Sequence, residues 1–186
     1  MRIIAGELKG RRLKTPYDDR VRPTTDKVKE AVFSMISPYL YDSVAVDLFA
    51  GTENLGLEAI SRGARRVYFA DKDRRSIALV RENTAYCRVE DRSVILWSDY
   101  RDALLKIEDP VDIIFLDPPY GSGFLEDALE MIASCGILSD GGIVVAEYAV
   151  GEELPDSFGA LSVIKKKKYG KIGISVYENA VVSEAE

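Results

Sequence analysis

The sequence predicts an α/β protein built on one doubly wound, mostly parallel sheet of seven strands, with a small N-terminal β-hairpin attached. From residue 44 onwards, five short apolar runs alternate with four amphipathic stretches, so βα units follow one another along the chain. Such units fold into a parallel sheet with helices on both faces. Near the C-terminus two strand-like runs follow one another directly, so we expect the sheet to end in a hairpin with one antiparallel strand.

The chain begins with the expected N-terminal hairpin. Residues 2–5 and 11–14 are short strand-like runs, and the segment between them contains two glycines, which favour a turn. We therefore divide the chain into a hairpin extension over residues 1–23 and a main domain over residues 24–186.

A helix is expected after the hairpin. The cluster Thr24-Thr25-Asp26 supplies oxygen atoms that can cap a helix N-terminus. Pro38 is expected to end this helix, because proline lacks the backbone N–H that a helix interior needs. Between these points apolar residues recur at the spacing of one helix face, namely Val28, Ala31, Val32, Met35 and Ile36.

The alternating units that follow have clear boundaries. The expected parallel strands are residues 44–49, 67–70, 94–97, 111–116 and 143–148. The expected helices between them are residues 54–62, 74–86, 102–107 and 124–135. The terminal hairpin comprises residues 161–168 and 172–178, joined through Tyr169-Gly170. In its second strand, alternation predicts inward side chains at Ile172, Ile174 and Val176.

Composition narrows the class of protein. A chain of 186 residues that is 47% hydrophobic and 30% charged can bury a sizeable core. Its apolar stretches fall far short of the roughly 20 residues that span a bilayer, and charged residues near Met1 precede any signal-like segment. We therefore expect a cytoplasmic protein without a transmembrane helix. With no histidine and two cysteines, the chain offers too few ligands for a zinc site and no imidazole for acid–base catalysis, so no metal centre is expected.

Charge is distributed unevenly along the chain. The net charge is −6, yet residues 1–30 carry nine Lys or Arg against five Asp or Glu, and Lys165–Lys168 with Lys171 form a second basic segment. Two basic ends therefore flank an acidic body. This pattern fits a domain that presents a local basic surface to a phosphate backbone. It fits a solvated lysine strand equally well, and charge alone leaves both interpretations open.

A glycine-containing turn follows the first parallel strand. In residues 47–56, Gly51 and Gly56 occupy the first and third glycine positions of a G-x-G-x-x-G fingerprint, and Glu53 replaces the middle glycine. A glutamate there opposes a dinucleotide, because that glycine lets the backbone approach the pyrophosphate. S-Adenosylmethionine (SAM) has no pyrophosphate, so the objection is weaker for this cofactor. A turn that serves packing alone is the competing interpretation.

Acidic residues follow the second and third strands. Asp71, twenty residues after Gly51, lies where an acid accepts hydrogen bonds from ribose hydroxyls. Asp99 follows the third strand, where a carboxylate can accept a hydrogen bond from an adenine amino group. For Asp73 and Asp99, a helix N-cap is the alternative interpretation.

The fourth strand runs directly into Asp117-Pro118-Pro119-Tyr120. An exocyclic amine of a base is a weak nucleophile, since its lone pair is delocalised into the ring. If the Asp117 carboxylate and the Pro118 carbonyl accept its two hydrogens, the nitrogen can direct its lone pair at the methyl group of SAM. The prolines keep the loop rigid, and Tyr120 offers a face on which an unstacked base can rest. Together with the other acids, this tetrapeptide predicts a SAM-dependent methyltransferase that acts on amino groups.

The chain as a whole resembles class I SAM-dependent methyltransferases, which have a Rossmann-like fold, and in particular the RsmD family of 16S rRNA guanine-N2 methyltransferases. The resemblance covers nearly the whole length, and its terminal pieces are more specific than the shared SAM motifs. It departs from the family at Glu53, where the family normally has glycine. The matching segments are residues 2–6, 9–13, 22–33, 47–51, 55–64, 117–120, 167–170 and 175–178.

The resemblance implies roles for individual residues. The turn after the first strand would bind the methionine part of SAM, Asp71 the ribose and Asp99 the adenine. The candidates for cofactor binding are Asp47, Phe49, Ala50, Gly51, Thr52, Asn54, Gly56, Asp71, Lys72, Asp99 and Tyr100. The candidates for contact with the target amine are Asp117, Pro118, Pro119 and Tyr120. The candidates for RNA contact are the basic residues Arg2, Lys9, Arg11, Arg12 and Arg22.

The implied substrate is the N2 atom of guanine 966 in 16S rRNA, either as free RNA or in the assembling small ribosomal subunit. Residues 24–186 would then form the SAM-dependent methyltransferase domain. The oligomeric state stays open, with a monomer slightly favoured. Three alternatives remain: a DNA methyltransferase for adenine N6 or cytosine N4, a nicotinamide oxidoreductase, and a catalytically weak RNA-binding protein of the same fold. Titration with SAM and with NAD separates these classes.

Overall fold

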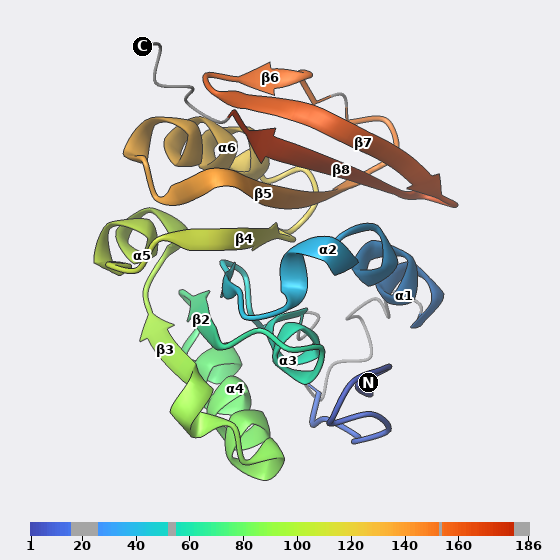
Figure 1. The fold of residues 1–186 in the computed structure, drawn as a ribbon, viewed down its shortest axis with the longest axis vertical. Helices are drawn as coiled ribbons and strands as arrows, with labels where there is room; N and C mark the ends of the chain where they lie inside the picture. Colours follow the sequence, from blue (N-terminus) through green and yellow to red (C-terminus); the bar gives the residue numbers. More distant parts are fainter. Residues whose placement is uncertain (16–25, 52–54, 153, 181–186) are drawn as a thin grey trace.

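The computed structural model describes residues 1–15, 26–51, 55–152 and 154–180, and these residues form a three-layer α/β fold around one mixed sheet (Figure 1). The sheet has eight strands in the order β3-β2-β1-β4-β5-β8-β7-β6. The strands are β1 Val44–Asp47, β2 Arg66–Asp71, β3 Ser93–Trp97, β4 Val111–Leu116, β5 Leu138–Ala149, β6 Ser157–Phe158, β7 Leu161–Tyr169 and β8 Ile172–Asn179. The helices are α1 Asp26–Met35, α2 Ser37–Leu40, α3 Leu55–Ser61, α4 Arg74–Cys87, α5 Tyr100–Lys106 and α6 Phe124–Cys135, with a 3₁₀ turn at Glu90–Arg92.

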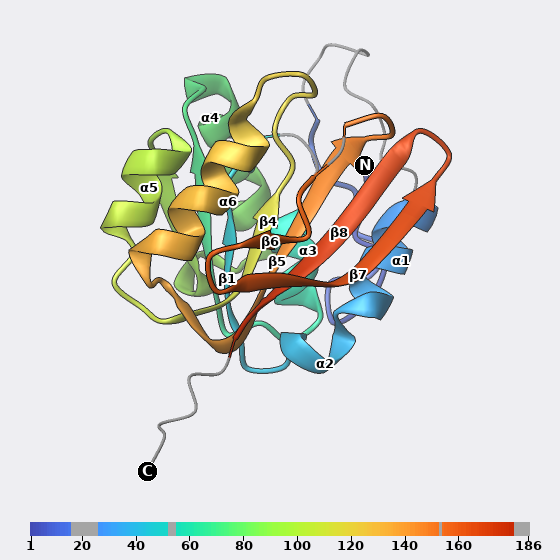
Figure 2. The ribbon, with the colours of Figure 1, turned by 90° about the horizontal axis from the view of Figure 1, so that it is seen from above.

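The predicted doubly wound architecture is confirmed. Strands β1 to β5 pair in parallel, and β8, β7 and β6 continue the sheet in antiparallel pairing. Helices α1 to α4 contribute to one hydrophobic core and α5 and α6 to the other, so both faces of the sheet are covered (Figure 2). The chain order reverses between β1 and β4, which creates the point where ligands of such sheets bind.

The sheet differs from the prediction in its number of strands and in the start of β5, and β1 ends at Asp47 instead of residue 49. The sheet has eight strands where seven were expected, because the two-residue strand β6 pairs with the start of β7 and is too short to give a sequence pattern. Strand β5 begins at Leu138, which pairs with Val111, and not at residue 143. Its first half contains Asp140, Gly141 and Gly142, which are residue types that are depleted in strands. The sequence pattern therefore does not indicate a strand there.

The prediction that Pro38 ends the first helix also needs a correction. Helix α1 ends at Met35, and Pro38 lies in the first turn of the separate short helix α2. Proline is tolerated there because the N–H groups of a first turn have no partner inside the helix. The predicted capping residues Thr24 and Thr25 lie outside the described residues.

The N-terminal hairpin is reduced to one antiparallel bridge between Arg2 and Arg12, and neither arm forms a strand. The segment is held by α3 instead of by a second strand ladder. The backbone N–H groups of Ile4 and Ala5 donate to the buried Glu58 carboxylate at 2.9 and 3.1 Å. Because three of its apolar side chains are buried in the same core as α1 and α3, the segment packs as part of the domain surface; these are Ile3, Leu8 and Leu13.

The C-terminal hairpin formed by β7 and β8 is confirmed. Strand β8 lies between β5 and β7, so both of its edges are paired. Ile174 and Val176 enter one core and Tyr177 enters the other, while Ile172 near the hairpin turn is partly buried. Within the described part of the chain, no helix combines the length and apolar character needed to cross a bilayer.

Candidate active site

Two cavities open beyond the carboxyl ends of the parallel strands, on either side of the loop that follows β4. One of about 370 Å³ lies over the ends of β1, β2 and β3, and one of about 340 Å³ lies over the ends of β4 and β5. Pro119 lines both cavities. The loop therefore separates two adjacent binding spaces, which is the arrangement required for transfer of a group from one bound molecule to another.

The first cavity, which we call the β1–β3 cavity, combines an apolar wall with an acidic rim. Five residues predicted to bind the cofactor line it: Phe49, Asp71, Lys72, Asp99 and Tyr100. The remaining lining consists of Leu48, Asp73, Ser76, Arg101, Pro119 and Phe124. These residues come from the segments at and after the ends of four strands and from the first turns of α4, α5 and α6, so the fold assembles the cavity from segments that are distant in sequence.

Three aromatic rings form the apolar wall of this cavity. The ring centroids of Phe49 and Tyr100 are 5.6 Å apart, and Tyr100 and Phe124 have the same separation. The Tyr100 hydroxyl donates to Asp127 on α6 at 2.5 Å, and burial together with this bond raises the pKa of Tyr100 to about 12. Tyr100 therefore acts as a neutral, fixed surface on which a flat ring can pack.

Asp71 lies at the end of β2 and faces the turn after β1. Its Oδ2 accepts the Gly51 N–H at 3.0 Å and its Oδ1 accepts the Asp73 N–H at 2.8 Å. Burial raises the pKa of this carboxyl, while the hydrogen bonds oppose the rise. Each carboxylate oxygen has a second lone pair, so Asp71 keeps the capacity to accept hydrogen bonds from a ligand.

The other acids at the strand ends cap helices. Asp99 accepts the N–H groups of Arg101 and Asp102 through Oδ1 and so caps α5, while Asp73 caps α4 in the same way. The N-cap interpretation is therefore correct for both residues. For Asp99 it is compatible with ligand contact, because the capping bonds use one oxygen and the residue lines the cavity.

Asp47 is the last residue of β1 and is not among the residues that line the cavity. Its side chain is 3% exposed, and its Oδ2 accepts the Gly56 N–H at 3.0 Å. Burial raises the pKa of Asp47 to about 7, and the nearby carboxylates of Asp117 and Asp71 add to the rise. A cation bound in front of this group would be attracted to its ionised form.

The glycines of the predicted fingerprint serve close packing. A Cβ at Gly56 would lie 2.3 Å from the Phe69 ring, and one at Gly51 would lie 2.1 Å from the Ser76 hydroxyl oxygen. Ala50 is buried, and its N–H donates to the Ala70 carbonyl at 3.0 Å. The predicted residues Thr52 and Asn54, like Glu53, lie outside the described residues.

These residues fit SAM. The aromatic wall suits adenine, and Asp71 at the cavity rim suits a ribose. The buried Asp47 carboxyl, with its raised pKa, provides latent negative charge for the positively charged sulfonium and ammonium groups.

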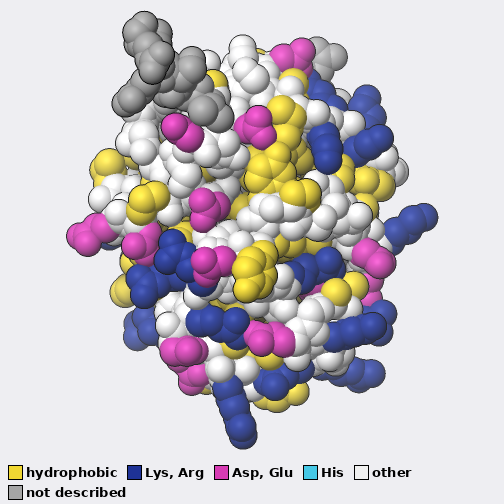
Figure 3. Space-filling model, in the orientation of Figure 1, with side chains coloured by type: hydrophobic (Ala, Val, Ile, Leu, Met, Phe, Trp, Pro, Cys, Tyr) yellow, Lys and Arg dark blue, Asp and Glu magenta, His cyan; other side chains and the backbone are white. Residues whose placement is uncertain are grey.

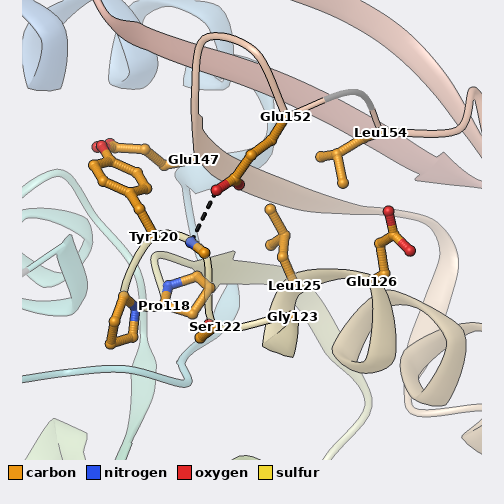
Figure 4. Close-up of a pocket in the computed structure, with 11 residues that line it drawn as sticks. Pro118, Tyr120, Ser122, Gly123, Leu125, Glu126, Glu147, Glu152 and Leu154 are labelled. Carbon is orange, nitrogen blue, oxygen red and sulfur yellow. Dashed lines mark hydrogen bonds between the residues drawn. The ribbon is translucent and has the colours of Figure 1, made fainter.

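The second cavity, which we call the β4–β5 cavity, contains the loop predicted to act on the amine. Asp117 is half-buried directly after β4, Pro118 is buried, and Pro118, Pro119 and Tyr120 line the cavity. The Tyr120 hydroxyl donates to Glu147 Oε1 at 2.9 Å, and the Gly121 N–H donates to Glu152 Oε1 at 2.9 Å. Figure 4 shows Glu147 beside the Tyr120 ring and Glu152 over the following turn.

Glu147 and Glu152 were not predicted from the sequence. Glu147 is an acid inside the apolar run of β5, and an ionisable residue in a strand buried on both faces is itself a signal of function. Glu152 and the aromatic residue Phe124 give no such signal, because only the fold brings them to the cavities.

The predicted RNA-contacting residues differ in their exposure and in their contacts within the protein. Arg2 pairs with Asp26 at 2.8 Å, and Arg11 donates to the Tyr86 carbonyl at the end of α4 at 3.1 Å. Lys9 and Arg12 are exposed, and Arg22 lies outside the described residues.

Comparison with known proteins gives matches over nearly the full chain. Residues 1–178 match the protein family described as "Conserved hypothetical protein 95". The YlbH protein of Bacillus subtilis (strain 168) is 39% identical over 96% of this chain and 98% of its own length. "Ribosomal RNA small subunit methyltransferase D" of Escherichia coli (strain K12) is 31% identical over 100% of this chain and 93% of its own length.

The fold is similar to that of a solved relative. The structure of yhhF from Escherichia coli has a TM-score of 0.87 and 30% sequence identity, and the match covers 97% of this chain and 98% of that one. The chain thus has the Rossmann-like methyltransferase fold that its strand order predicts.

Proposed function

Because this chain belongs to the RsmD family, we propose that it is a SAM-dependent rRNA methyltransferase of the small ribosomal subunit. In its finer form, the proposal is that the enzyme methylates the N2 atom of guanine 966 in 16S rRNA, in the cytoplasm. The substrate is the free RNA or the assembling subunit. The full-length similarity to a ribosomal RNA small subunit methyltransferase supports this choice over a DNA enzyme.

The observation that carries the proposal is the position of Asp117-Pro118-Pro119-Tyr120 between two cavities that share Pro119. One cavity fits SAM, and the other is lined by Pro118, Pro119 and Tyr120, with Asp117 directly before them in the chain. Direct transfer requires donor and acceptor to meet in line at one point. The shared wall at the end of β4 supplies such a point.

The chain's own residues would prepare the amine for attack. The Asp117 carboxylate and the Pro118 carbonyl accept the two amine hydrogens, so the nitrogen lone pair is freed from the ring and points to the β1–β3 cavity. Tyr120 supports the unstacked base, and its bond to Glu147 fixes the ring. SAM, when bound, supplies an electrophilic methyl group. The proton that the amine loses can pass to Asp117.

We propose that the RNA contacts two basic surfaces of the protein. The first consists of the exposed residues Lys9 and Arg12 of the N-terminal extension, residues 1–23. The second is β7, where Lys165–Lys168 are exposed. Lys167 pairs with Ile174, which pairs with Glu147, so Lys167 lies two strands, about 10 Å, from the β4–β5 cavity. Figure 3 shows Lys and Arg side chains gathered along the right-hand and lower parts of one face.

The test is a methylation assay with isotope-labelled SAM on small subunits and on free 16S rRNA that lack the modification. We expect label in RNA, and nucleoside mass spectrometry should identify N2-methylguanosine. The matched control is the Asp117→Asn variant, which should bind SAM and transfer little label. Label in adenosine, or transfer to DNA in place of RNA, would refute the guanine assignment, and absence of SAM binding would refute the methyltransferase assignment.

A further inference from the structure

The β4–β5 cavity is lined by carboxylates where a phosphate-binding cavity would have cations. Glu126, Glu147 and Glu152 line it, and its lining among the described residues includes neither Lys nor Arg. Carboxylates only accept hydrogen bonds when they are ionised. The cavity therefore favours a neutral group that presents N–H donors, such as a nucleobase edge, and disfavours a phosphate.

Glu147 differs from the other two acids in its burial and its contacts. Its side chain is 6% exposed, on a strand whose surrounding residues are apolar. Its Oε1 accepts the Tyr120 hydroxyl, the residue on which the base is proposed to rest. Because Glu147 lines the cavity, its carboxylate can also accept a hydrogen bond from a bound base. Each of its oxygens can accept more than one hydrogen bond.

The strand register places Glu147 beside the residue that receives the amine. Leu116 of β4 pairs with Ala146 of β5, so Asp117 and Glu147 follow at the same level of neighbouring strands. Adjacent strands are about 4.8 Å apart, which is a suitable spacing for two acceptors that contact neighbouring donors of one base. In guanine the N1–H donor stands directly next to the N2 amine.

We propose that Glu147 is a specificity-determining residue that accepts the N1–H of guanine while Asp117 accepts a hydrogen of the N2 amine. This inference rests on the proposed function. Adenine has an unprotonated acceptor at N1, next to its N6 amine, and cytosine has one at N3, next to its N4 amine. An ionised Glu147 would repel both, because acceptor would face acceptor. The Tyr120 bond holds the carboxylate in place for this discrimination.

The experiment compares guanine with 2-aminopurine, which carries the same 2-amino group but lacks both the N1–H and the O6 atom, so the Glu147→Gln variant assigns the part of the difference that is due to the N1–H contact. Small subunits are reconstituted with 16S rRNA that carries either guanine or 2-aminopurine at the methylated position. 2-Aminopurine keeps the amine next to N1 but has no N1–H. For the unmodified enzyme we expect kcat/KM to be roughly 10- to 100-fold higher for guanine, the value of a hydrogen bond to a charged group.

The variant is Glu147→Gln, whose amide accepts the Tyr120 hydroxyl and can present either a donor or an acceptor to N1. We expect the ratio of kcat/KM for guanine to kcat/KM for 2-aminopurine to fall to within about threefold of unity, mainly because the rate on guanine falls. Glu130→Gln, the same change at an exposed position of α6 outside the cavity, should keep the full preference. SAM titration and thermal unfolding establish that each variant is folded.

The outcomes separate this inference from the proposed function. An unchanged preference for guanine in the folded Glu147→Gln variant would overturn the role of Glu147 and leave the proposed function intact. Failure of the unmodified enzyme to methylate guanine would overturn the proposed function itself. Should Glu147→Gln fail to fold, Tyr120→Phe provides the second variant, because it removes only the hydroxyl bonded to Glu147. Its preference for guanine should fall by at least threefold, and an unchanged preference would also overturn the inference.

Discussion

Asp47 offers a quantitative test of the electrostatics of the site through the substitution Asp47→Asn. The side chain is buried at the end of β1, where its pKa is raised to about 7 from an ordinary value of 3.8. Asparagine has nearly the same shape and can accept the Gly56 N–H through its amide oxygen, but it carries no charge at any pH. The substitution therefore isolates the free energy of ionising this carboxyl inside the protein.

The magnitude and sign follow from linkage. The folded protein holds the Asp47 proton more tightly than the unfolded chain does, so ionisation costs stability as pH rises from about 4 to about 7. A shift of about three pKa units corresponds to about 4 kcal/mol, and the cost is complete only above pH 7. Relative to the unmodified protein, Asp47→Asn should gain stability by about 2 kcal/mol at pH 5 and by about 4 kcal/mol at pH 8.

The assay is urea denaturation of the SAM-free protein at several pH values between 5 and 8. Asp99→Asn, at a partly exposed helix cap, is the matched control for the loss of a carboxylate near the same cavity. A difference in unfolding free energy between Asp47→Asn and its parent that is equal at pH 5 and pH 8 would refute the reasoning. SAM affinity gives a second measurement, and it should be weaker in the variant because the ligand's positive charges lose their partner.

Three further predictions address the remaining parts of the site. Asp117→Ala should lower turnover by roughly 10²–10³-fold in single-turnover methylation while SAM affinity stays within about threefold, and equal turnover would contradict the mechanism. Asp71→Ala should weaken SAM by roughly 10- to 100-fold in a calorimetric titration, because it loses hydrogen bonds to an ionised acceptor, and an unchanged affinity would remove Asp71 from the cofactor site. Charge reversal at Lys9 and Arg12 should weaken RNA binding and reduce its salt dependence with SAM binding intact, and if the salt slope is unaffected, Lys167 marks the next surface to test.

Periodicity predicted most of the fold because each element is buried on a definite side. The helix at 124–135 and the strand at 111–116 have the expected boundaries, since their apolar patterns begin and end sharply. The start of β5 could not be predicted, because Gly141 and Gly142 interrupt its apolar pattern, Gly141 has a positive φ, and the pairing of Leu138 with Val111 is separated from the regular ladder by a shift in register. Tertiary pairing overrides local preference there.

The candidate site was predictable where chemistry follows directly on a strand end. Asp71 is the last residue of β2, and Asp117 directly follows β4. The carboxyl ends of parallel strands share one edge of the sheet. Glu152 reaches the β4–β5 cavity only because the chain after β5 folds back over the loop after β4. A contact of that kind depends on the path of a connection, which residue patterns do not encode.

The order of the strands also predicts how substitutions should divide between binding and turnover. Residues at the ends of β1, β2 and β3 line the cavity that fits SAM, whereas those at the ends of β4 and β5 line the other cavity. A change on the first side alters the affinity for the methyl donor. A change on the second side alters the positioning of the acceptor, so its cost falls on the transition state. Pro119 lines both cavities, so its substitution should affect both measurements, and a pure effect on either one would show that the cavities are not coupled through this loop.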